Sequence, residues 1–332
     1  MSTWRSLVDA SGAVSLGEHV VADGHRRHCG VRVQTHLHLD HMSRFSTSKG
    51  VHELVMHPAT RDLLTLEGHP DLNWRANVWT PWYEEAVTLG EVKVELLDAG
   101  HMLGSAQVVA TYSDGYRVGY SGDFSWPLSS VAQVDELVVD AAYGSDKAVR
   151  RFSRDKAESD FLELVTERLL RGPVVVKAHR GTLHRAAILL FGSVRNPIVV
   201  SEKVAQELQV YAGYGLATDV CTEPNVSSGA YVKLIGHREA IESQVVGRAT
   251  VVTLTGFRMR SEPIQYISDR GYNVCLSDHA DYEETLLYVE RSGAKRIRVD
   301  NTRHGNGVEL ALGISERLGL EVRYDIAEED PY

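Results

Sequence analysis

Four potential metal ligands lie within six residues near the start of the chain. The segment THLHLDHM, residues 35–42, contains His36, His38, Asp40 and His41. Side chains two positions apart in an extended segment point to the same side, so His36 and His38 can reach one metal ion together. Asp40 and His41 follow where the strand gives way to a loop or a helix start, and they can face a second ion. Imidazole and carboxylate ligands together suit zinc, and also manganese or iron.

Further histidines and aspartates come directly after, or very near, other apolar strands of the predicted fold. They stand in DAGHMLGSA, YSGDF, VVDAAYG, LSDHADY and NTRHGNG, and they are His101, Asp123, Asp140, His279 and His304. Any one of these histidines taken alone would be an ordinary core or surface residue more often than a ligand. Because such residues recur at one strand end after another, we expect a metal site.

Short apolar segments rich in β-branched residues alternate with longer helical patterns along the chain. Strands are predicted at 31–34, 93–99, 107–113, 116–121, 136–143, 173–178, 197–201, 250–255 and 296–301. Helices are predicted at 155–171, 203–215, 281–291 and 308–319. The alternation predicts an α/β protein with layered sheets and helices.

Length, charge and cysteine content limit the classes of protein to which this chain can belong. The 332 residues suffice for one large domain or two ordinary ones. The net charge of −10 at first argues against nucleic acid as a partner, but residues 146–195 hold eleven Lys and Arg against six Asp and Glu. Such a basic segment in an acidic chain can hold a polyanion. With three distant cysteines, no apolar stretch of membrane-spanning length and no secretory signal pattern, we expect a cytoplasmic protein.

The pattern HxHxDH, followed by GH and then SGDF, resembles the metallo-β-lactamase fold. The further pieces VVDAAYG, SDHADY and RHG resemble the β-CASP branch of that fold, which comprises nucleases of RNA processing and DNA repair. The resemblance runs from about Asp23 to about Gly307. It implies an αββα metallo-β-lactamase sandwich formed by residues 1–145 and 249–332, with an α/β β-CASP domain inserted at 146–248.

The resemblance also implies two divalent metal ions, zinc or else manganese. The implied ligands are His36, His38 and His101 for the first ion, Asp40, His41 and His304 for the second, and Asp123 as the bridge. The last position stays open between His304 and Asn301, because extra residues separate the strand from its histidine here. Asp23 resembles the acid that orients the ligand loop.

Two neighbouring metal ions would lower the pKa of a shared water to about 7 and stabilise charge on phosphoryl oxygens. The departing sugar oxygen needs a proton, and His279 is the candidate acid. By the resemblance, Asp140 pairs with His279 and holds its other nitrogen. Asp40, His279 and Asp140 form the expected catalytic set.

The predicted substrate contacts lie in the inserted segment. PVVVKAHRGTLHRAAILL resembles a family segment ending in Gly-Arg-Ala-Gln-Glu, whose glycine and glutamate are absent here. Arg185 matches the arginine, which can fork onto a phosphate, and we expect Arg180 and Lys177 to contact substrate with it. Four aromatic residues between the first ligand groups could stack on bases, but we expect them to pack in the core; they are Trp74, Trp79, Trp82 and Tyr83.

These features favour a two-metal nuclease that cleaves phosphodiester bonds of single-stranded nucleic acid, with RNA slightly preferred. A DNA repair exonuclease of the same family is the first alternative. A small-molecule hydrolase, such as a thioesterase or lactonase, is the second, and the insertion and His279 argue against it. A non-catalytic subunit with a decayed site is the third, and the intact ligand set argues against it. Single-stranded RNA or DNA is the expected partner, no membrane partner is expected, and a homodimer stays open.

Overall fold

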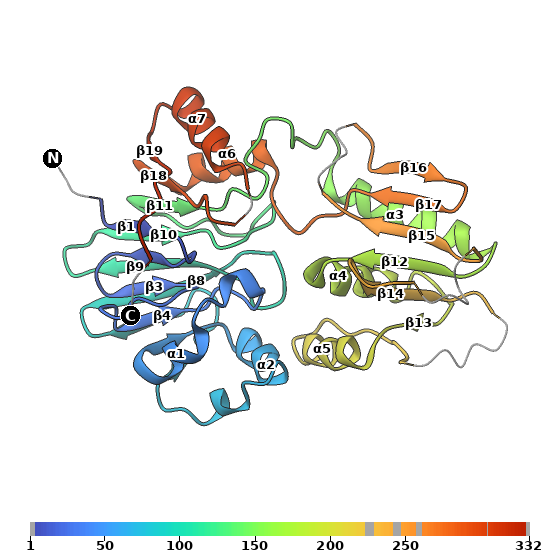
Figure 1. Ribbon diagram of the computed structural model, residues 1–332, viewed down its shortest axis with the longest axis horizontal. Coiled ribbons are helices and arrows are strands. Elements are labelled where there is room, and N and C mark those ends of the chain that lie inside the picture. Colours follow the sequence, from blue (N-terminus) through green and yellow to red (C-terminus); the bar gives the residue numbers. More distant parts are fainter. Residues whose placement is uncertain (1–3, 223–228, 242–246, 257–260, 304, 330–332) are drawn as a thin grey trace. The chain divides into compact units, whose positions relative to one another are not determined.

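The computed structural model describes residues 4–222, 229–241, 247–256, 261–303 and 305–329. This part of the chain contains three β-sheets and seven α-helices, and the chain divides into two compact units (Figure 1). Unit 1 comprises Met1–Val149 and His279–Tyr332, and unit 2 comprises Arg150–Asp278. The structure thus has the mixed α/β class that the sequence predicts. Among the described helices, none has the length and apolarity needed to cross a membrane.

The first sheet of unit 1 has six short strands in the order of the chain. They are β1 (Ser6–Val8), β2 (Val14–Leu16), β3 (Val20–Ala22), β4 (Val31–Val33), β5 (Glu53–Val55) and β6 (Val78–Trp79). Strands β3 to β6 pair in parallel. Their carboxyl ends therefore lie along one edge of the sheet.

The second sheet of unit 1 has the order β19-β18-β11-β10-β9-β8-β7. Its strands are β7 (Ala86–Leu89), β8 (Val92–Asp98), β9 (Ala106–Tyr112), β10 (Arg117–Tyr120), β11 (Glu136–Val139), β18 (Arg296–Val299) and β19 (Glu321–Arg323). Strands β10, β11, β18 and β19 pair in parallel. Strand β8 points the same way, because β8 and β10 are both antiparallel to β9.

The two sheets of unit 1 share one apolar core. Val31 and Val33 of β4 belong to the same buried cluster as Val108 of β9 and Tyr120 of β10. Alternate residues of a strand face opposite ways, so the other face of each sheet needs its own cover. Helices α6 (Tyr282–Ser292) and α7 (Gly307–Leu318) cover the second sheet (Figure 1).

The first sheet carries the remaining helical segments of unit 1. They are the 3₁₀ segments η1 (Leu39–His41) and η2 (Pro70–Asn73) and the helices α1 (Phe45–Val51) and α2 (Pro58–Leu66). Arg32 of β4 points away from the shared core and lies over the ring of Phe45 at the start of α1. Helix α1, which follows the segment of the first four predicted ligands, is therefore packed on this outer face.

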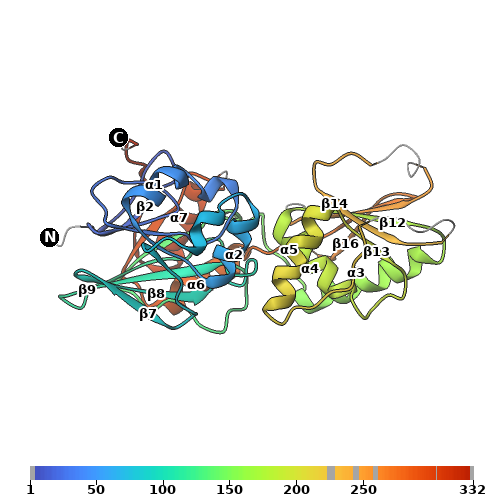
Figure 2. The same cartoon turned by 90° about the horizontal axis from the view of Figure 1, so that it is seen from below.

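Unit 2 contains the third sheet, with the order β13-β14-β12-β15-β17-β16. Its strands are β12 (Val174–Ala178), β13 (Ile198–Val199), β14 (Val232–Gly236), β15 (Thr250–Leu254), β16 (Ile264–Ser268) and β17 (Gly271–Val274). Helices α3 (Arg154–Leu169), α4 (Arg180–Leu190) and α5 (Glu202–Gly213) pack on one face of this sheet (Figure 2). Phe161, Leu183 and Leu208, one from each helix, share a core with Val176 of β12.

The second boundary of the predicted insertion differs from the structure. The predicted boundary is residue 248, whereas unit 2 extends to Asp278. The reason is strand pairing, because β15 pairs in parallel with β12 and β17 pairs with β15. Residues just after 248 thus complete the sheet of unit 2, and only the segment from His279 returns to unit 1. The first boundary, placed at 145, lies close to the observed end at Val149.

Candidate metal centre

The predicted ligands of unit 1 follow strands whose carboxyl ends point the same way within each sheet. His36 lies beyond β4, His101 beyond β8, Asp123 beyond β10 and Asp140 directly after β11. The strand predicted at 136–143 ends at Val139, so Asp140 lies in the turn that follows it. Side chains that follow strands of both sheets meet at one place in the unit.

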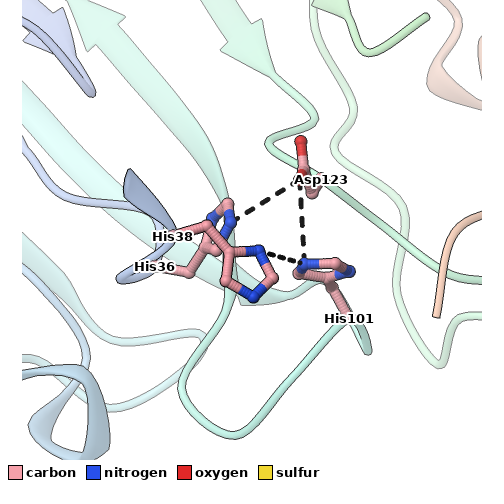
Figure 3. Close-up of side chains that lie close together, drawn as sticks. All are labelled: His36, His38, His101 and Asp123. Carbon is pink, nitrogen blue, oxygen red and sulfur yellow. Dashed lines mark hydrogen bonds and ion pairs between the residues drawn. The ribbon is translucent and has the colours of Figure 1, made fainter. Parts of the chain in front are cut away.

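Four of these side chains form a close group. One ligand atom from each of His36, His38, His101 and Asp123 lies within 4.8 Å of the others. The Oδ2 atom of Asp123 is 3.6 Å from Nε2 of His36 and 3.7 Å from Nε2 of His101. Nε2 of His101 is 3.2 Å from Nδ1 of His38. Figure 3 shows the three imidazoles and the carboxylate converging on a common space.

The hydrogen bonds behind His36 decide which of its nitrogens faces this space. The Thr35 hydroxyl donates to Oδ2 of Asp23 at 2.6 Å and lies 3.0 Å from Nδ1 of His36. Because the hydroxyl proton is already used, the oxygen accepts from the Nδ1–H of His36. Nε2 of His36 then carries a lone pair toward Asp123, as a metal ligand requires.

His41 forms the second part of the centre. Its Nδ1 donates to Oδ2 of Asp23 at 2.6 Å, and its Nε2 lies 3.1 Å from Oδ1 of Asp123. Asp23 is fully buried at a positive φ of 54°, and it also accepts the backbone N–H of Thr35 at 2.8 Å. A left-handed aspartate with this many donors orients both the ligand segment and the His41 ring. Asp23 thus lies where the sequence places the orienting acid.

The buried nitrogens of this centre are suited to a cation. Nε2 of His36 and Nε2 of His41 are both buried without a hydrogen-bond partner, and both lie near the Asp123 carboxylate. Burial lowers the pKa of His41, but the carboxylates of Asp123 and Asp23 outweigh it and raise the value to about 9. Burial and the charge of His41 hold the pKa of His36 well below its usual range. Two divalent cations that share Asp123 would satisfy these nitrogens, one at His36 and the other at His41.

A buried arginine and glutamine support the ligand segment, and sequence reasoning missed both. Arg32 donates to the Ser43 carbonyl and to Oε1 of Gln34, each at 2.7 Å. Gln34 in turn donates to the carbonyl oxygen of His36 at 2.6 Å and to that of His41 at 3.0 Å. Burial lowers the pKa of Arg32 to about 9. The signal was present in VRVQ, where polar residues alternate with the valines of a buried strand.

The remaining predicted ligands are less closely grouped. Asp40 is exposed, with 55% of its side chain accessible, and its Oδ2 lies 3.8 Å from Nε2 of His41. His304 lies outside the described residues. The side chain of Asn301, the alternative at that position, lies against Gly307 at the start of α7.

His279 and Asp140 form the pair that the resemblance implies. Nδ1 of His279 lies 3.3 Å from Oδ2 of Asp140, and Nε2 of His279 lies 3.9 Å from Oδ2 of Asp123. The backbone of Asp140 is fixed by a hydrogen bond to Oγ of Ser121 at 2.9 Å. His279 precedes α6, whose N-cap is Asp281 in a capping box. Asp281 therefore fixes the start of this helix two residues after His279.

The three predicted substrate contacts in unit 2 all have partners within the protein. Lys177 donates to the Glu239 carbonyl at 2.7 Å. Arg180 donates to Oε1 of the buried Glu207 at 2.6 Å, while His184 lies 2.6 Å from Oε2 of the same carboxylate. Arg180 therefore joins α4 to α5, and its role in binding substrate stays a prediction.

Arg185 has a different environment. It forms an ion pair with Glu158 of α3, and Arg154 shares the same carboxylate at 3.4 Å. Burial and the charge of Arg185 lower the pKa of Arg154 to about 10, although Glu158 opposes them. The Nε of Arg185 is buried without a hydrogen-bond partner. Two guanidinium groups thus share the Glu158 carboxylate.

The aromatic residues between the first ligand groups lie mostly at the surface. Trp74, Trp79 and Trp82 are exposed, so the expectation that they pack in the core was wrong. Tyr83 is partly buried and stacks on His57, with ring centroids 4.1 Å apart.

The known proteins that are similar to this chain carry names that refer to different activities. No protein-family model matches it. The RNase J-like protein of Methanocaldococcus jannaschii is 26% identical over 193 residues, which are 52% of this chain and 45% of that protein. The "Probable DNA ligase" of Opitutus terrae is 25% identical over 296 residues, which are 80% of this chain and 27% of that protein. The chain thus spans less than half the length of these two relatives.

A solved structure and a shorter relative align with this chain over most of their own length. A crystal structure of a protein of unknown function from Enterococcus faecalis V583 aligns with a TM-score of 0.61 at 12% identity, over 90% of this chain and 80% of that one, and shows the fold alone. The "Uncharacterized protein in lig 3'region" of Acidianus ambivalens is 36% identical over 137 residues, 40% of this chain. Since those residues make up 97% of the Acidianus protein, the chain belongs to the same protein family as that protein.

Proposed function

We propose that this chain is a metal-dependent nuclease of the β-CASP branch of the metallo-β-lactamase fold, hydrolysing phosphodiester bonds of single-stranded nucleic acid. In this proposal unit 1 is the αββα catalytic domain, and unit 2 is the inserted β-CASP domain. The observation that carries the proposal is the group of His36, His38, His101 and Asp123, whose ligand atoms lie within 4.8 Å of one another beside the His279–Asp140 pair. The RNase J-like relative supports it.

The proposed ligand assignment follows the two parts of the centre. His36, His38 and His101 would hold one divalent ion, His41 and Asp40 the other, and Asp123 would contact both. When bound, two such ions supply positive charge at the phosphoryl oxygens and lower the pKa of a water molecule. Zinc suits the imidazole-rich first group, and manganese accepts the same donors.

The protein's own groups perform the remaining steps. His279 would give the proton that the departing sugar oxygen needs, because its Nε2 faces the centre while its Nδ1 lies 3.3 Å from Asp140. The Asp140 carboxylate would hold the ring in orientation and favour its charged form. Arg185, which shares Glu158 with Arg154, would contact a phosphate of the strand.

Whether the strand is RNA or DNA distinguishes two candidate functions. RNA is the slightly favoured strand, and the RNase J-like relative is consistent with that choice. A nuclease acting on DNA ends is the second candidate. It is favoured by the relative named a probable DNA ligase, which aligns with 80% of this chain.

One experiment tests the function and separates these candidates. RNA and DNA of one sequence, labelled at the 5′ end or the 3′ end, are incubated with the protein and zinc or manganese. We expect one of the two polymers to be cut, and Asp40→Ala with His41→Ala to abolish cutting. Hydrolysis of thioesters or lactones without cutting of any polynucleotide would overturn the proposal.

A further inference from the structure

A row of three aromatic rings lies at the sheet edge that also carries the ligand segment. The ring of Trp82 meets the ring of His57 edge to face, with centroids 5.3 Å apart and planes at 86°. The His57 ring stacks on Tyr83 with centroids 4.1 Å apart and planes at 18°. Trp82 remains 52% exposed, although a tryptophan at the end of a strand could bury far more of its surface.

Strand order places this row near the candidate metal centre. The ligand segment follows β4, His57 follows β5, and Trp82 follows β6, and these three strands are parallel neighbours. Adjacent strands are about 4.8 Å apart, so the end of β6 lies about 10 Å from the end of β4 along the sheet edge. A single strand whose phosphate reaches the metal ligands can therefore bring a nearby base to Trp82.

Hydrogen bonds tie the row to the loop that holds His101. The Tyr83 hydroxyl donates to the Ser105 carbonyl at 2.9 Å, and the Ser105 hydroxyl oxygen accepts the backbone N–H of His101 at 3.1 Å. Thr60 of α2, the helix that His57 caps, donates to the Gly104 carbonyl at 2.7 Å. The position of Trp82 is thus set by the same elements that set His101.

The exposed face of this aromatic row suits a neutral ring as its ligand rather than a charged group. Burial lowers the pKa of His57 to about 4, so this imidazole is uncharged at neutral pH. Leu39, which stands between the ligands His38 and Asp40, is 91% exposed and adds apolar surface at the same edge. A nucleobase offers a flat π-face and can stack on an exposed indole whatever its sequence.

We propose that Trp82 is a stacking platform for a nucleobase of the single strand that the metal centre cleaves. The inference rests on the proposed nuclease function and names a subsite of that substrate. It assigns Trp82 a role in holding the strand, without a part in the chemical step. The protein should therefore prefer unpaired nucleic acid. A base within a duplex would have to leave its stack and its partner base to reach Trp82, which costs free energy.

Binding can be measured without cleavage. Protein treated with a chelator is titrated with short oligothymidylate, and its tryptophan fluorescence is recorded. We expect quenching in the wild-type protein and in Trp74→Phe, and its loss in Trp82→Phe, because only the Trp82 indole lies against a base. Trp74 is a matched control, since it is 74% exposed and lies before β6, at the opposite end of that strand from Trp82.

Kinetics then separate holding from chemistry. Trp82→Ala should raise the KM for single strands by about 5- to 100-fold with little change in kcat, as the loss of one stacked base predicts. Trp82→Phe should recover most of the affinity, because it keeps a ring. Hydrolysis of the small diester bis(p-nitrophenyl) phosphate should be unchanged in both variants, and the effect on KM should persist at high salt.

Each outcome decides the inference. Quenching that survives Trp82→Phe, or a KM in Trp82→Ala equal to that in Trp74→Ala, overturns the platform while the nuclease function stands. If the wild-type protein cuts no polynucleotide, the proposed function fails. The fluorescence titration still tests whether Trp82 stacks on a base in that case.

Discussion

Nδ1 of His279 lies 3.3 Å from Oδ2 of Asp140, while Nε2 of the same ring lies 3.9 Å from Oδ2 of Asp123. One imidazole therefore links an acid outside the ligand group to the carboxylate at its centre. This arrangement suits a ring that gives a proton to a leaving group, because one nitrogen is held by a carboxylate and the other faces the centre.

Replacing His279 should slow cleavage without removing metal. We expect His279→Ala to lower kcat on oligonucleotides by about 10²- to 10⁴-fold, the usual worth of a positioned general acid. The same variant should hydrolyse bis(p-nitrophenyl) phosphate at close to the wild-type rate, because the nitrophenolate leaves without a proton. Equal losses on both substrates, or a drop in metal content, would contradict the assignment of His279 as the acid.

The support of His41 by Asp23 predicts a selective effect on metal affinity. Asp23→Asn keeps the size of the side chain but removes the charge that holds the His41 ring. We expect affinity for the ion that His41 would hold to fall by about 10- to 100-fold, as for other residues that orient ligands. Competition with a chelating dye measures this loss.

A matched control for that variant is Asp9→Asn. Asp9 is also fully buried in unit 1, and it pairs with Arg26 at 3.2 Å rather than with a ligand. This variant should lower the melting temperature while leaving metal affinity intact. The assignment of Asp23 fails if the two variants bind metal equally well.

Glu207 predicts how the stability of unit 2 depends on pH. Burial alone raises the pKa of its carboxyl, but the hydrogen bond and charge of His184, together with Arg180, lower it below the ordinary value of 4.5. A carboxylate with a lowered pKa contributes stability that is complete above the unfolded-state value and is lost as the pH falls through the folded-state value.

Glu207→Gln should therefore destabilise unit 2 most at neutral pH, by about 3–5 kcal/mol, as when one member of a buried pair is removed. Its melting temperature should approach that of the wild type as the pH falls below about 4.5. Glu163→Gln, an exposed position on α3, is the control. A difference between wild type and Glu207→Gln that stays constant from pH 7 to acid would show that the charge of Glu207 contributes no stability.

Arg185 predicts the salt dependence of strand binding. If it contacts a phosphate, Arg185→Ala should weaken binding to all single strands and reduce the slope of log K against log salt by about 0.7. Arg171→Ala, just beyond the C-terminal end of α3, should leave the slope unchanged, because its partner is the exposed Glu167. Identical slopes for the two variants would place Arg185 outside the strand-binding surface.

The sequence predicted the fold where hydrophobic patterns are local. The strands around Val31, Val94 and Val176 and the helices beginning near Arg154 and Tyr282 appear in the structure within a few residues of the predicted ends. The end of unit 2 was missed because it depends on the pairing of β15 with β12, a contact between distant segments that no local pattern contains.

The sequence also predicted which side chains would meet, because several ligands share the simple property of following a strand. His36, His101 and Asp123 lie together as expected. The supporting contacts were not predictable in the same way. The contact of Arg180 with Glu207 was not predicted, because a basic side chain in a sequence does not reveal which carboxylate lies beside it. The exposure of Trp82 was not predicted either. No local sequence pattern shows whether an aromatic residue between two strands lies in the core or at the surface.

Metal content measured on the purified protein tests the central claim most directly. After exposure to zinc or manganese and removal of unbound ions, we expect close to two divalent ions per chain by elemental analysis. Asp123→Ala should lose most of this metal, because its carboxylate lies near His36, His41 and His101 alike. His19→Ala, a surface histidine paired with Glu91, should keep it. A wild-type protein that retains no divalent ion, or an Asp123→Ala protein that retains as much as the wild type, would contradict the account.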